Sequence, residues 1–377
     1  MSIKSKLKIN TREGKAKLDP VDHSLVVIIL MLLCFGLVMV FSASSANAHY
    51  VHGNATFFFK KQLVWAVAGL AAMWVVSTFP YKKIKQFSNL LFVVTILLLV
   101  IVKLAGKEIN GARRWLGFGS LTFQPSEVAK LTLILFLAKS ITVYPNRINQ
   151  LKNGYLRYLL IIAFVAGLVL LQPHLSGALV IAVGGMAVLF AAGYKKKYFI
   201  GTALCGIPLV IYLAIAEPYR FKRITTFLDP FSDMLGESWQ IVQSLYAIGS
   251  GGLFGLGLGQ SRQKFLYIPE PQNDFIFAII CEELGFVGAV FLMFLFALLI
   301  WKGIMIAKNA PDEYSALVAT GITSLVAVQV LMNIAVVTST IPVTGVPLPF
   351  FSYGGSSLMI LLMEMGILLN ISRNIEK

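Results

Sequence analysis

Six charged side chains lie within or at the edges of long apolar segments of this sequence, and they are its clearest candidates for chemistry. A charge at membrane depth costs free energy, so residues of this kind usually serve a function. They are Glu127, Lys130, Asp274, Glu282, Glu283 and Glu364. An outer carboxylate accompanied by basic side chains would suit group transfer from an anionic lipid.

Asp274 lies where a charged loop meets an apolar run, at residues 268–278. Its carboxylate could cap the next helix and complement its dipole, or it could act as a general base at the outer membrane surface. Position alone favours the cap. Glu282 lies about 80° further around a helix and shares a broad face with Asp274, whereas Glu283 points almost opposite. We expect one of these two glutamates to face the interior and form a structural ion pair.

Residues 124–127 begin the fourth apolar run with a proline and Glu127, which are ordinary helix-start signals. Lys130, one turn further in, is unusual. Its ammonium could reach back to the outer interface along its alkyl chain. Alternatively, it could contact an anion together with Arg113 and Arg114, which precede this run.

A long segment at about residues 217–273 keeps basic side chains where membrane topology does not require them. This suggests an anionic partner on the outer face, such as a lipid phosphate or pyrophosphate. The candidates for binding it are Arg220, Arg223 and Lys264, with Gln240 and Gln243 on one side of a short predicted interfacial helix.

Two glycine-containing segments have distinct expected roles. Residues 249–259 are glycine-rich but follow no strand and lack a lysine–serine/threonine pair, which argues against a nucleotide-binding loop; we expect close helix packing or a flexible gate.

Residues 341–357 hold three prolines and three glycines and cannot be helical. Apolar, irregular backbone is tolerated in a membrane only against protein or a water-filled cavity. We therefore expect a re-entrant or cavity-lining loop, which includes Ser352 and Tyr353.

The composition identifies an integral membrane protein. The 377 residues are 57% hydrophobic and 13% charged, against about one quarter charged in soluble domains. The net charge of +15 comes from short basic runs between apolar segments, and without a nucleic-acid motif it indicates topology and lipid contact. Three isolated cysteines and four scattered histidines give no disulfide or metal-ligand spacing.

The fold expected is all-α, with about ten transmembrane helices. Residues 1–22 are a basic tail, and residues 23–377 form one membrane domain. The apolar runs are 24–43, 62–79, 88–105, 124–143, 156–173, 175–193, 198–216, 275–301, 314–340 and 354–371. The positive-inside rule places both termini in the cytoplasm. Residues 46–48 look like a signal-peptidase site, but the preceding stretch is long enough to span, so we expect an uncleaved anchor.

Four long motifs, in order, resemble the SEDS family (shape, elongation, division and sporulation). They lie at residues 111–115, 124–130, 273–285 and 347–355, and the resemblance extends from about residue 20 to 375. Residues 261–270 are more similar to the division and sporulation branch, FtsW and SpoVE, than to the elongation branch, RodA. At His174 many members have an aspartate, so we assign His174 no chemical role.

The resemblance implies a peptidoglycan glycosyltransferase in the bacterial cytoplasmic membrane. Its substrates would be lipid II and the nascent glycan. Its partners would be a class B penicillin-binding protein transpeptidase and other division or sporulation membrane proteins. By the same resemblance Asp274 occupies an essential aspartate position, and Arg113 or Arg114 and Lys130 match basic positions implicated in function.

This chemistry fits the residues, because a polyprenyl pyrophosphate leaves readily once its charge is neutralised. Only a base is then needed, and direct attack would invert the anomeric centre. We expect Asp274 to be the base, with Glu127, Glu282 and Glu283 in supporting roles. A divalent cation, Mg²⁺ or Mn²⁺, would help to neutralise pyrophosphate, but its ligands cannot be placed. Two alternatives stay open at this point: a lipid II flippase and a non-enzymatic division scaffold.

Overall fold

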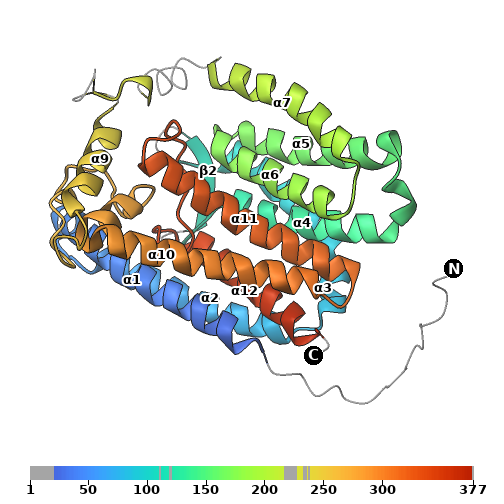
Figure 1. Cartoon of the computed structure of the whole chain (residues 1–377), viewed down its shortest axis with the longest axis horizontal. Helices are drawn as coiled ribbons and strands as arrows, with labels where there is room; N and C mark the ends of the chain where they lie inside the picture. Colours follow the sequence, from blue (N-terminus) through green and yellow to red (C-terminus); the bar gives the residue numbers. More distant parts are fainter. Residues whose placement is uncertain are drawn as a thin grey trace.

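The computed structural model describes residues 21–109, 112–118, 121–215, 227–231, 236 and 238–375. Within these residues each of the ten predicted apolar runs coincides with a helix, and the helices lie side by side in one bundle (Figure 1). They are α1 (His23–His52), α2 (Phe57–Thr78), α3 (Tyr81–Ala105), α4 (Pro125–Val143), α5 (Arg157–Leu170), α6 (Leu175–Ala191), α7 (Lys196–Ile215), α10 (Ile276–Lys308), α11 (Glu313–Val337) and α12 (Gly355–Arg373).

These helices make the chain an all-α polytopic membrane protein. Seven described helical segments are long and apolar enough to cross a bilayer: α1, α2, α3, residues 151–170 including α5, α10, α11 and α12. α6 is apolar but shorter, and α4 carries Glu127, Lys130 and Lys139. The all-α membrane fold class is therefore confirmed, whereas the number of ten membrane crossings remains a prediction.

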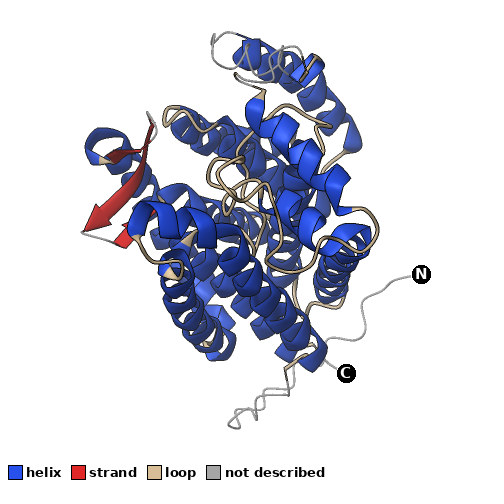
Figure 2. Cartoon of the chain, turned by 90° about the vertical axis from the view of Figure 1, so that its left-hand side faces the viewer, coloured by secondary structure: helices blue, strands red, loops and turns tan. Residues whose placement is uncertain are grey.

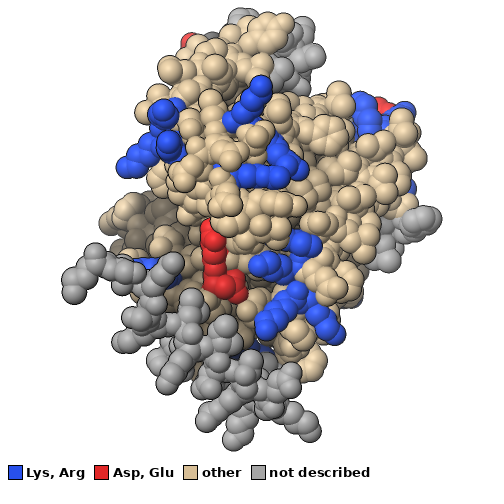
Figure 3. Space-filling view, turned by 90° about the vertical axis from the view of Figure 1, so that its right-hand side faces the viewer, with Lys and Arg blue, Asp and Glu red and all other residues tan. Residues whose placement is uncertain are grey.

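Basic side chains gather at one end of the bundle. α1 begins and α12 ends at the same end (Figure 1). Lysine and arginine side chains gather on the face at that end, with few acidic side chains among them (Figure 3). There Asp22 accepts hydrogen bonds from the first turn of α1 and pairs with Lys302 of α10 at 3.1 Å. This distribution agrees with the positive-inside rule. The cytoplasmic location of both termini stays a prediction.

A small antiparallel sheet stands at the opposite end, where the sequence had placed only a loop. Its strands are β1 (Lys107–Ile109), β2 (Ala112–Phe118) and β3 (Leu121–Phe123), in the order β1-β2-β3 (Figure 2). Glu108 pairs with Arg113 across β1 and β2. Successive side chains of a strand point to opposite faces, so Arg113 and Arg114 point in different directions.

α10 is broken in its first half at Gly285, which has φ 65° and ψ −167°. A broken helix leaves backbone groups unpaired, and these cannot be hydrated inside a bilayer. The glycine-rich segment that follows α9 (Trp239–Gly251) pairs with them instead. Four hydrogen bonds of 2.9–3.1 Å join the two: Phe286 N to Gly252 O, Val287 N to Leu253 O, Leu256 N to Glu282 O and Gly257 N to Glu283 O.

Glycine is required on both sides of this junction. A Cβ at Gly285 would lie 2.3 Å from Gly255 N, and a Cβ at Gly251 would lie 2.0 Å from Cys281 O. The predictions of a helix near residues 238–246 and of close packing by the glycine-rich segment are therefore confirmed.

We predict that Gly285→Ala lowers the free energy of unfolding by at least about 2 kcal/mol, because these backbone angles are essentially restricted to glycine. The adjacent backbone leaves no room to relax. Thermal unfolding of the detergent-solubilised protein measures the effect. Gly249→Ala is the matched control, since Gly249 lies on α9 with nothing within 4 Å of an added Cβ. Equal unfolding temperatures for the two variants would contradict the prediction.

Candidate active site

A cavity of about 870 Å³ opens at the end of the bundle opposite the basic face. The last turns of α1, the first turns of α2, α4 and α12, strand β2 and the segments before α6, α10 and α12 all contribute to its walls. This volume lies in the range of ligand-binding clefts. The cavity brings together these sequence-predicted residues: Asp274, Arg114, Lys130, Lys264, Glu127, Ser352 and Tyr353.

Asp274 lies half-buried in the loop before α10, and its backbone is anchored from α11. Asn333 Nδ2 donates 2.8 Å hydrogen bonds to the carbonyls of Asp274 and Val346. Gly345 lies against the carboxylate, because a Cβ there would be 3.2 Å from Asp274 Oδ2. The N-cap position of α10 is Phe275, one residue after Asp274. Asp274 is therefore not the N-cap residue itself, and the alternative that it complements the helix dipole stays a prediction.

The predicted cavity-lining loop is confirmed, and it holds the Asp274 segment. Residues 338–354 are non-helical and line the cavity from Gly345 onward. Ser352 Oγ donates to Asn273 O at 2.7 Å and accepts from Leu348 N at 2.7 Å. Tyr353 N donates to Gln272 O at 2.8 Å. Ser352 and Tyr353 thus fix the backbone next to Asp274.

The first turns of α4 contribute a buried ion pair. Lys130 Nζ lies 2.8 Å from Glu127 Oε2, and the two side chains are only 7% and 11% exposed. Lys130 therefore does not reach back to the membrane surface. Glu364 of α12 also lines the cavity and is close enough to interact electrostatically with both residues. One lysine thus lies near two carboxylates at membrane depth.

The two arginines of β2 occupy different environments. Arg114 Nε donates to Gln172 O at 3.0 Å, a second guanidinium nitrogen donates to Pro173 O, and Arg114 lines the cavity. Arg113 is half-exposed, lies 3.4 Å from Glu108 and is absent from the cavity lining. Of the two positions predicted to bind phosphate, only Arg114 is therefore at the cavity.

His174, to which the sequence assigned no role, lies beside these cations. Burial, together with the positive charges of Arg114 and Lys130, lowers the pKa of His174 to about 3. The imidazole is neutral at physiological pH and can donate or accept a hydrogen bond. We call Arg114, Lys130 and His174 the α4 wall of the cavity.

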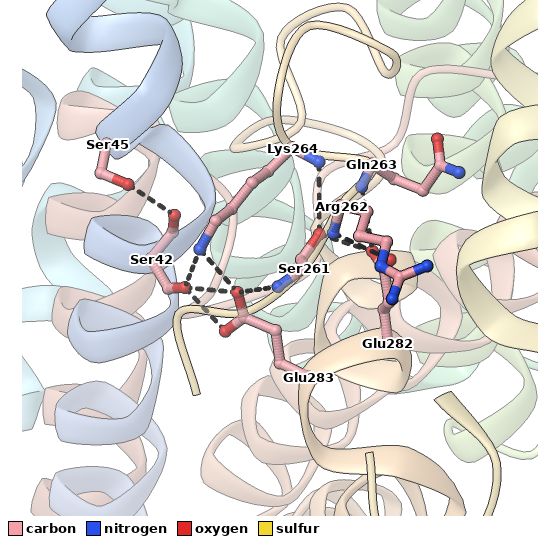
Figure 4. A network of polar contacts seen from close by, with 8 residues as sticks. All are labelled: Ser42, Ser45, Ser261, Arg262, Gln263, Lys264, Glu282 and Glu283. Carbon is pink, nitrogen blue, oxygen red and sulfur yellow. Dashed lines mark hydrogen bonds and ion pairs between the residues drawn. The ribbon is translucent and has the colours of Figure 1, made fainter. Parts of the chain in front are cut away.

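Lys264 and the two consecutive glutamates form a buried network between α1, α10 and the loop before α10 (Figure 4). Lys264 Nζ lies 2.9 Å from Glu283 Oε1 and 3.2 Å from Ser42 Oγ. The Lys264 side chain is 3% exposed and that of Glu283 is fully buried. The expected structural ion pair is present. This geometry does not support the expectation that Lys264 holds a phosphate.

The Glu282 carboxylate binds backbone N–H groups of the same loop. It accepts from the N–H groups of Arg262 and Gln263 at 3.0 and 3.3 Å, and from Ser261 Oγ at 2.5 Å. Both glutamates therefore hold the segment at residues 261–264 that leads to Asp274, and Ser261 contacts each of them (Figure 4). Neither Glu282 nor Glu283 lines the cavity.

The remaining predicted residues lie elsewhere. Arg220 and Arg223 fall outside the described residues. Gln240 and Gln243 lie on α9, which packs on α10, and neither lines the cavity. Conversely, the sequence reasoning missed Lys61, Trp65 and Gln329, which do line it. A basic pair at the start of the second apolar run and a polar side chain within the ninth run, which forms α11, were the available signals.

The described residues do not fit a protein-bound metal. Among them, no group of three histidine, cysteine, aspartate or glutamate side chains lies close enough to hold a metal ion. The divalent cation considered from the sequence therefore has no ligand set in this part of the chain.

Comparisons with known proteins agree on the relationship. A family model described as "Cell cycle protein", covering FtsW, RodA and SpoVE, matches residues 23–377. The stage V sporulation protein E of Bacillus subtilis (strain 168) is 47% identical over 93% of this chain and 97% of that protein. A protein of Coxiella burnetii named "Probable peptidoglycan glycosyltransferase FtsW" is 41% identical over 94% of this chain and 97% of its own length.

Two solved structures share the fold. A chain from a study of a peptidoglycan synthase complex, in which polymerization and crosslinking are coordinated, matches with a TM-score of 0.79 and 32% identity. The match covers 95% of this chain and 99% of that one. The rod shape determining protein RodA of Thermus thermophilus matches with a TM-score of 0.72 and 30% identity, over 95% and 98% of the two chains. Higher identity to the FtsW and SpoVE relatives supports the branch expected from the sequence.

We predict that Lys264→Met destabilises the protein by about 3–5 kcal/mol, because it leaves the Glu283 charge buried and unpaired. The double variant Lys264→Met with Glu283→Gln should recover most of this loss. Thermal unfolding in detergent gives the coupling between the two sites. Glu108→Gln, which breaks the exposed pair with Arg113, is the control and should cost less than about 1 kcal/mol. Additive effects of the two changes at the buried pair would refute the coupling.

A second prediction concerns acid stability. The pKa of His174 is lowered in the folded state from 6.5 to about 3. The unfolded chain therefore binds more protons between these values, and stability falls as pH drops below 6.5. His174→Gln should weaken the fall in unfolding temperature between about pH 7.5 and pH 5. His49→Gln, at an exposed position of α1, should follow the wild type. Identical pH profiles for wild type and His174→Gln would show that His174 is not the group involved.

Proposed function

Since the chain belongs to the FtsW, RodA and SpoVE family of cell cycle proteins and is a peptidoglycan glycosyltransferase, we propose that it polymerises lipid II into β-1,4-linked glycan strands. The reaction takes place at the outer face of the bacterial cytoplasmic membrane, in division or sporulation. The relatives are named as glycosyltransferases, which favours this activity over the flippase and scaffold alternatives.

The observation that carries the mechanism is that one cavity holds a carboxylate, Asp274, together with the cationic α4 wall. Arg114 stabilises the pyrophosphate of the donor as negative charge develops on it, and Lys130, although paired with Glu127, is the second cation on this wall. Asp274 accepts the proton of the attacking sugar hydroxyl. The remaining contacts around Asp274 hold its backbone still, so little reorganisation accompanies the reaction.

The step balances without a further reactant. The oxygen of the acceptor 4-hydroxyl forms a bond to the anomeric carbon of the donor, and the bond from that carbon to the pyrophosphate oxygen breaks. The electron pair leaves with the polyprenyl pyrophosphate, and the hydroxyl proton passes to Asp274. Attack on the face opposite the leaving group inverts the anomeric centre.

The proposed partner is a class B penicillin-binding protein that crosslinks the new strands. The support comes from the solved neighbour that belongs to a complex coordinating polymerization and crosslinking. Ten membrane crossings, with both termini in the cytoplasm, complete the proposal. This topology puts the cavity on the side of the membrane where the transpeptidase works.

We predict that Asp274→Asn abolishes polymerisation of labelled lipid II, with a rate loss of about 10²–10⁴-fold expected when a general base is removed. The assay uses the purified chain with its class B partner, whose transpeptidase site is inactivated. Glu108→Gln is the matched carboxylate control, since Glu108 is exposed and outside the cavity. If the folded Asp274→Asn variant makes strands at the wild-type rate, Asp274 is structural. If the wild type in a confirmed complex makes none, the proposed activity fails.

A further inference from the structure

A second cation lies in the same cavity, on the side formed by α1 and α2. Lys61 of α2 lines the cavity together with His52, Phe58, Trp65 and Tyr353, and we call these five residues the α2 wall. β2 and α6 lie above the bundle axis in Figure 1, whereas α1 and α2 lie along its lower edge. The α2 wall and the α4 wall are therefore contributed by different elements: α1, α2 and the segment before α12 form the first, and β2, α4 and the segment before α6 form the second.

Lys61 differs from the other lysines of the cavity in how its charge is balanced. Lys130 pairs with Glu127, and Lys264 pairs with Glu283. Among the described residues no carboxylate pairs with Lys61, and its ammonium lies 4.2 Å from the centroid of the Phe57 ring. A cation–π contact only partly offsets the charge. The N–H groups of the Lys61 ammonium can therefore donate hydrogen bonds to an anionic ligand.

The rings around Lys61 form one continuous aromatic surface. His52 stacks on Phe57 with centroids 3.8 Å apart, and Phe58 meets Tyr353 edge to face at 5.0 Å. Trp65 packs against Gly355, where a Cβ would lie 2.2 Å from the indole ring. Aromatic rings with a cation among them suit a ligand that has apolar sugar faces and a nearby phosphate.

Lys61 also lies at the border between the cavity and the bilayer. Trp65, one turn further along α2, lines the cavity. Val64 and Val67 of the same helix are 68% and 61% exposed on its lipid-facing side. A lysine near the end of a spanning helix can place its ammonium at headgroup level. A ligand bound here can keep its headgroup in the cavity and its hydrocarbon chain in the membrane.

Asp274 is connected to both walls. On one side, Gly345 lies against its carboxylate, and the neighbouring Thr344 carbonyl accepts a hydrogen bond from Ser176 of α6, next to the α4 wall. On the other side, the backbone of Tyr353 in the α2 wall donates to Gln272 O at 2.8 Å. The segments that hold Asp274 therefore contact both walls, and Asp274 shares the cavity with their cations.

We propose that Lys61 and the α2 wall bind the acceptor, a lipid-linked disaccharide, through its pyrophosphate. This inference rests on the proposed function, because polymerisation of lipid II joins two molecules that each carry a pyrophosphate. The α4 wall binds the pyrophosphate that departs from the donor sugar. The α2 wall takes the pyrophosphate that stays on the acceptor, and the acceptor hydroxyl faces Asp274. Each anion then has its own cationic wall.

The test separates donor from acceptor. The donor is a tagged lipid-linked glycan oligomer whose terminal 4-hydroxyl is blocked, so that it can only donate. The acceptor is labelled lipid II. Initial rates of the product that carries both tag and label are measured with the purified complex, while the concentration of each substrate is varied in turn. The wild type must form this product, and its failure would count against the proposed function itself.

Lys61→Met should raise the half-saturating concentration of the acceptor about tenfold and change that of the donor by less than about twofold. Lys61→Arg should restore the wild-type value, because it keeps the charge. Lys60→Met is the matched control, since Lys60 is exposed and absent from the cavity lining. Thermal unfolding in detergent establishes that each variant is folded, and Lys61→Gln replaces Lys61→Met if the latter does not fold.

Three results would overturn the proposal. One is an equal shift of both half-saturating concentrations, or no shift of either, in the Lys61→Met variant. Another is the same acceptor defect in Lys60→Met, which would indicate a general surface effect. The third is failure of Lys61→Arg to restore acceptor binding, which would show that the positive charge at this position is not what the acceptor recognises.

Discussion

Inside a bilayer every backbone N–H and C=O group must find its partner within the protein, and the functional end of this bundle depends on how that constraint is met. α10 is broken at Gly285, and the segment before α12 is irregular. The broken helix is completed by backbone hydrogen bonds from the glycine-rich segment after α9. The irregular segment lines a cavity and bonds to the loop before α10. Non-helical backbone therefore occurs where it shapes the site.

The buried charged side chains also find their partners within the protein. Both buried lysines of the described residues have carboxylate partners: Lys130 pairs with Glu127 within α4, and Lys264 of the loop before α10 pairs with Glu283 of α10. The Lys264–Glu283 pair, with Ser42, ties the loop before α10 to α1. Such a pair adds little net stability but fixes one arrangement, because breaking it leaves a buried charge. The result is a carboxylate, Asp274, whose backbone is held by several hydrogen bonds in a cavity that also contains lysine and arginine side chains.

The sequence predicted the helices well because spans of about twenty apolar residues have few alternatives. It also singled out Asp274 and Lys130, since charges at membrane depth are rare, and it named Arg114 only together with Arg113, as basic residues preceding the fourth apolar run. It did not predict that Arg113 and Arg114 diverge, because the three short strands at residues 107–109, 112–118 and 121–123 were not recognised from their residues. Nor could it show that Glu283 neutralises Lys264 or that Lys61 lines the cavity, since both follow from helix packing.

If glycan transfer takes place in this cavity with Asp274 as the base, the acceptor must bind there with its hydroxyl at the carboxylate. A structure of the complex with a lipid II analogue whose pyrophosphate linkage cannot be transferred tests this directly. We expect an acceptor hydroxyl within about 3 Å of the Asp274 carboxylate, with pyrophosphate beside Arg114 and Lys130. A headgroup bound outside the cavity, or a hydroxyl turned away from Asp274, would contradict it.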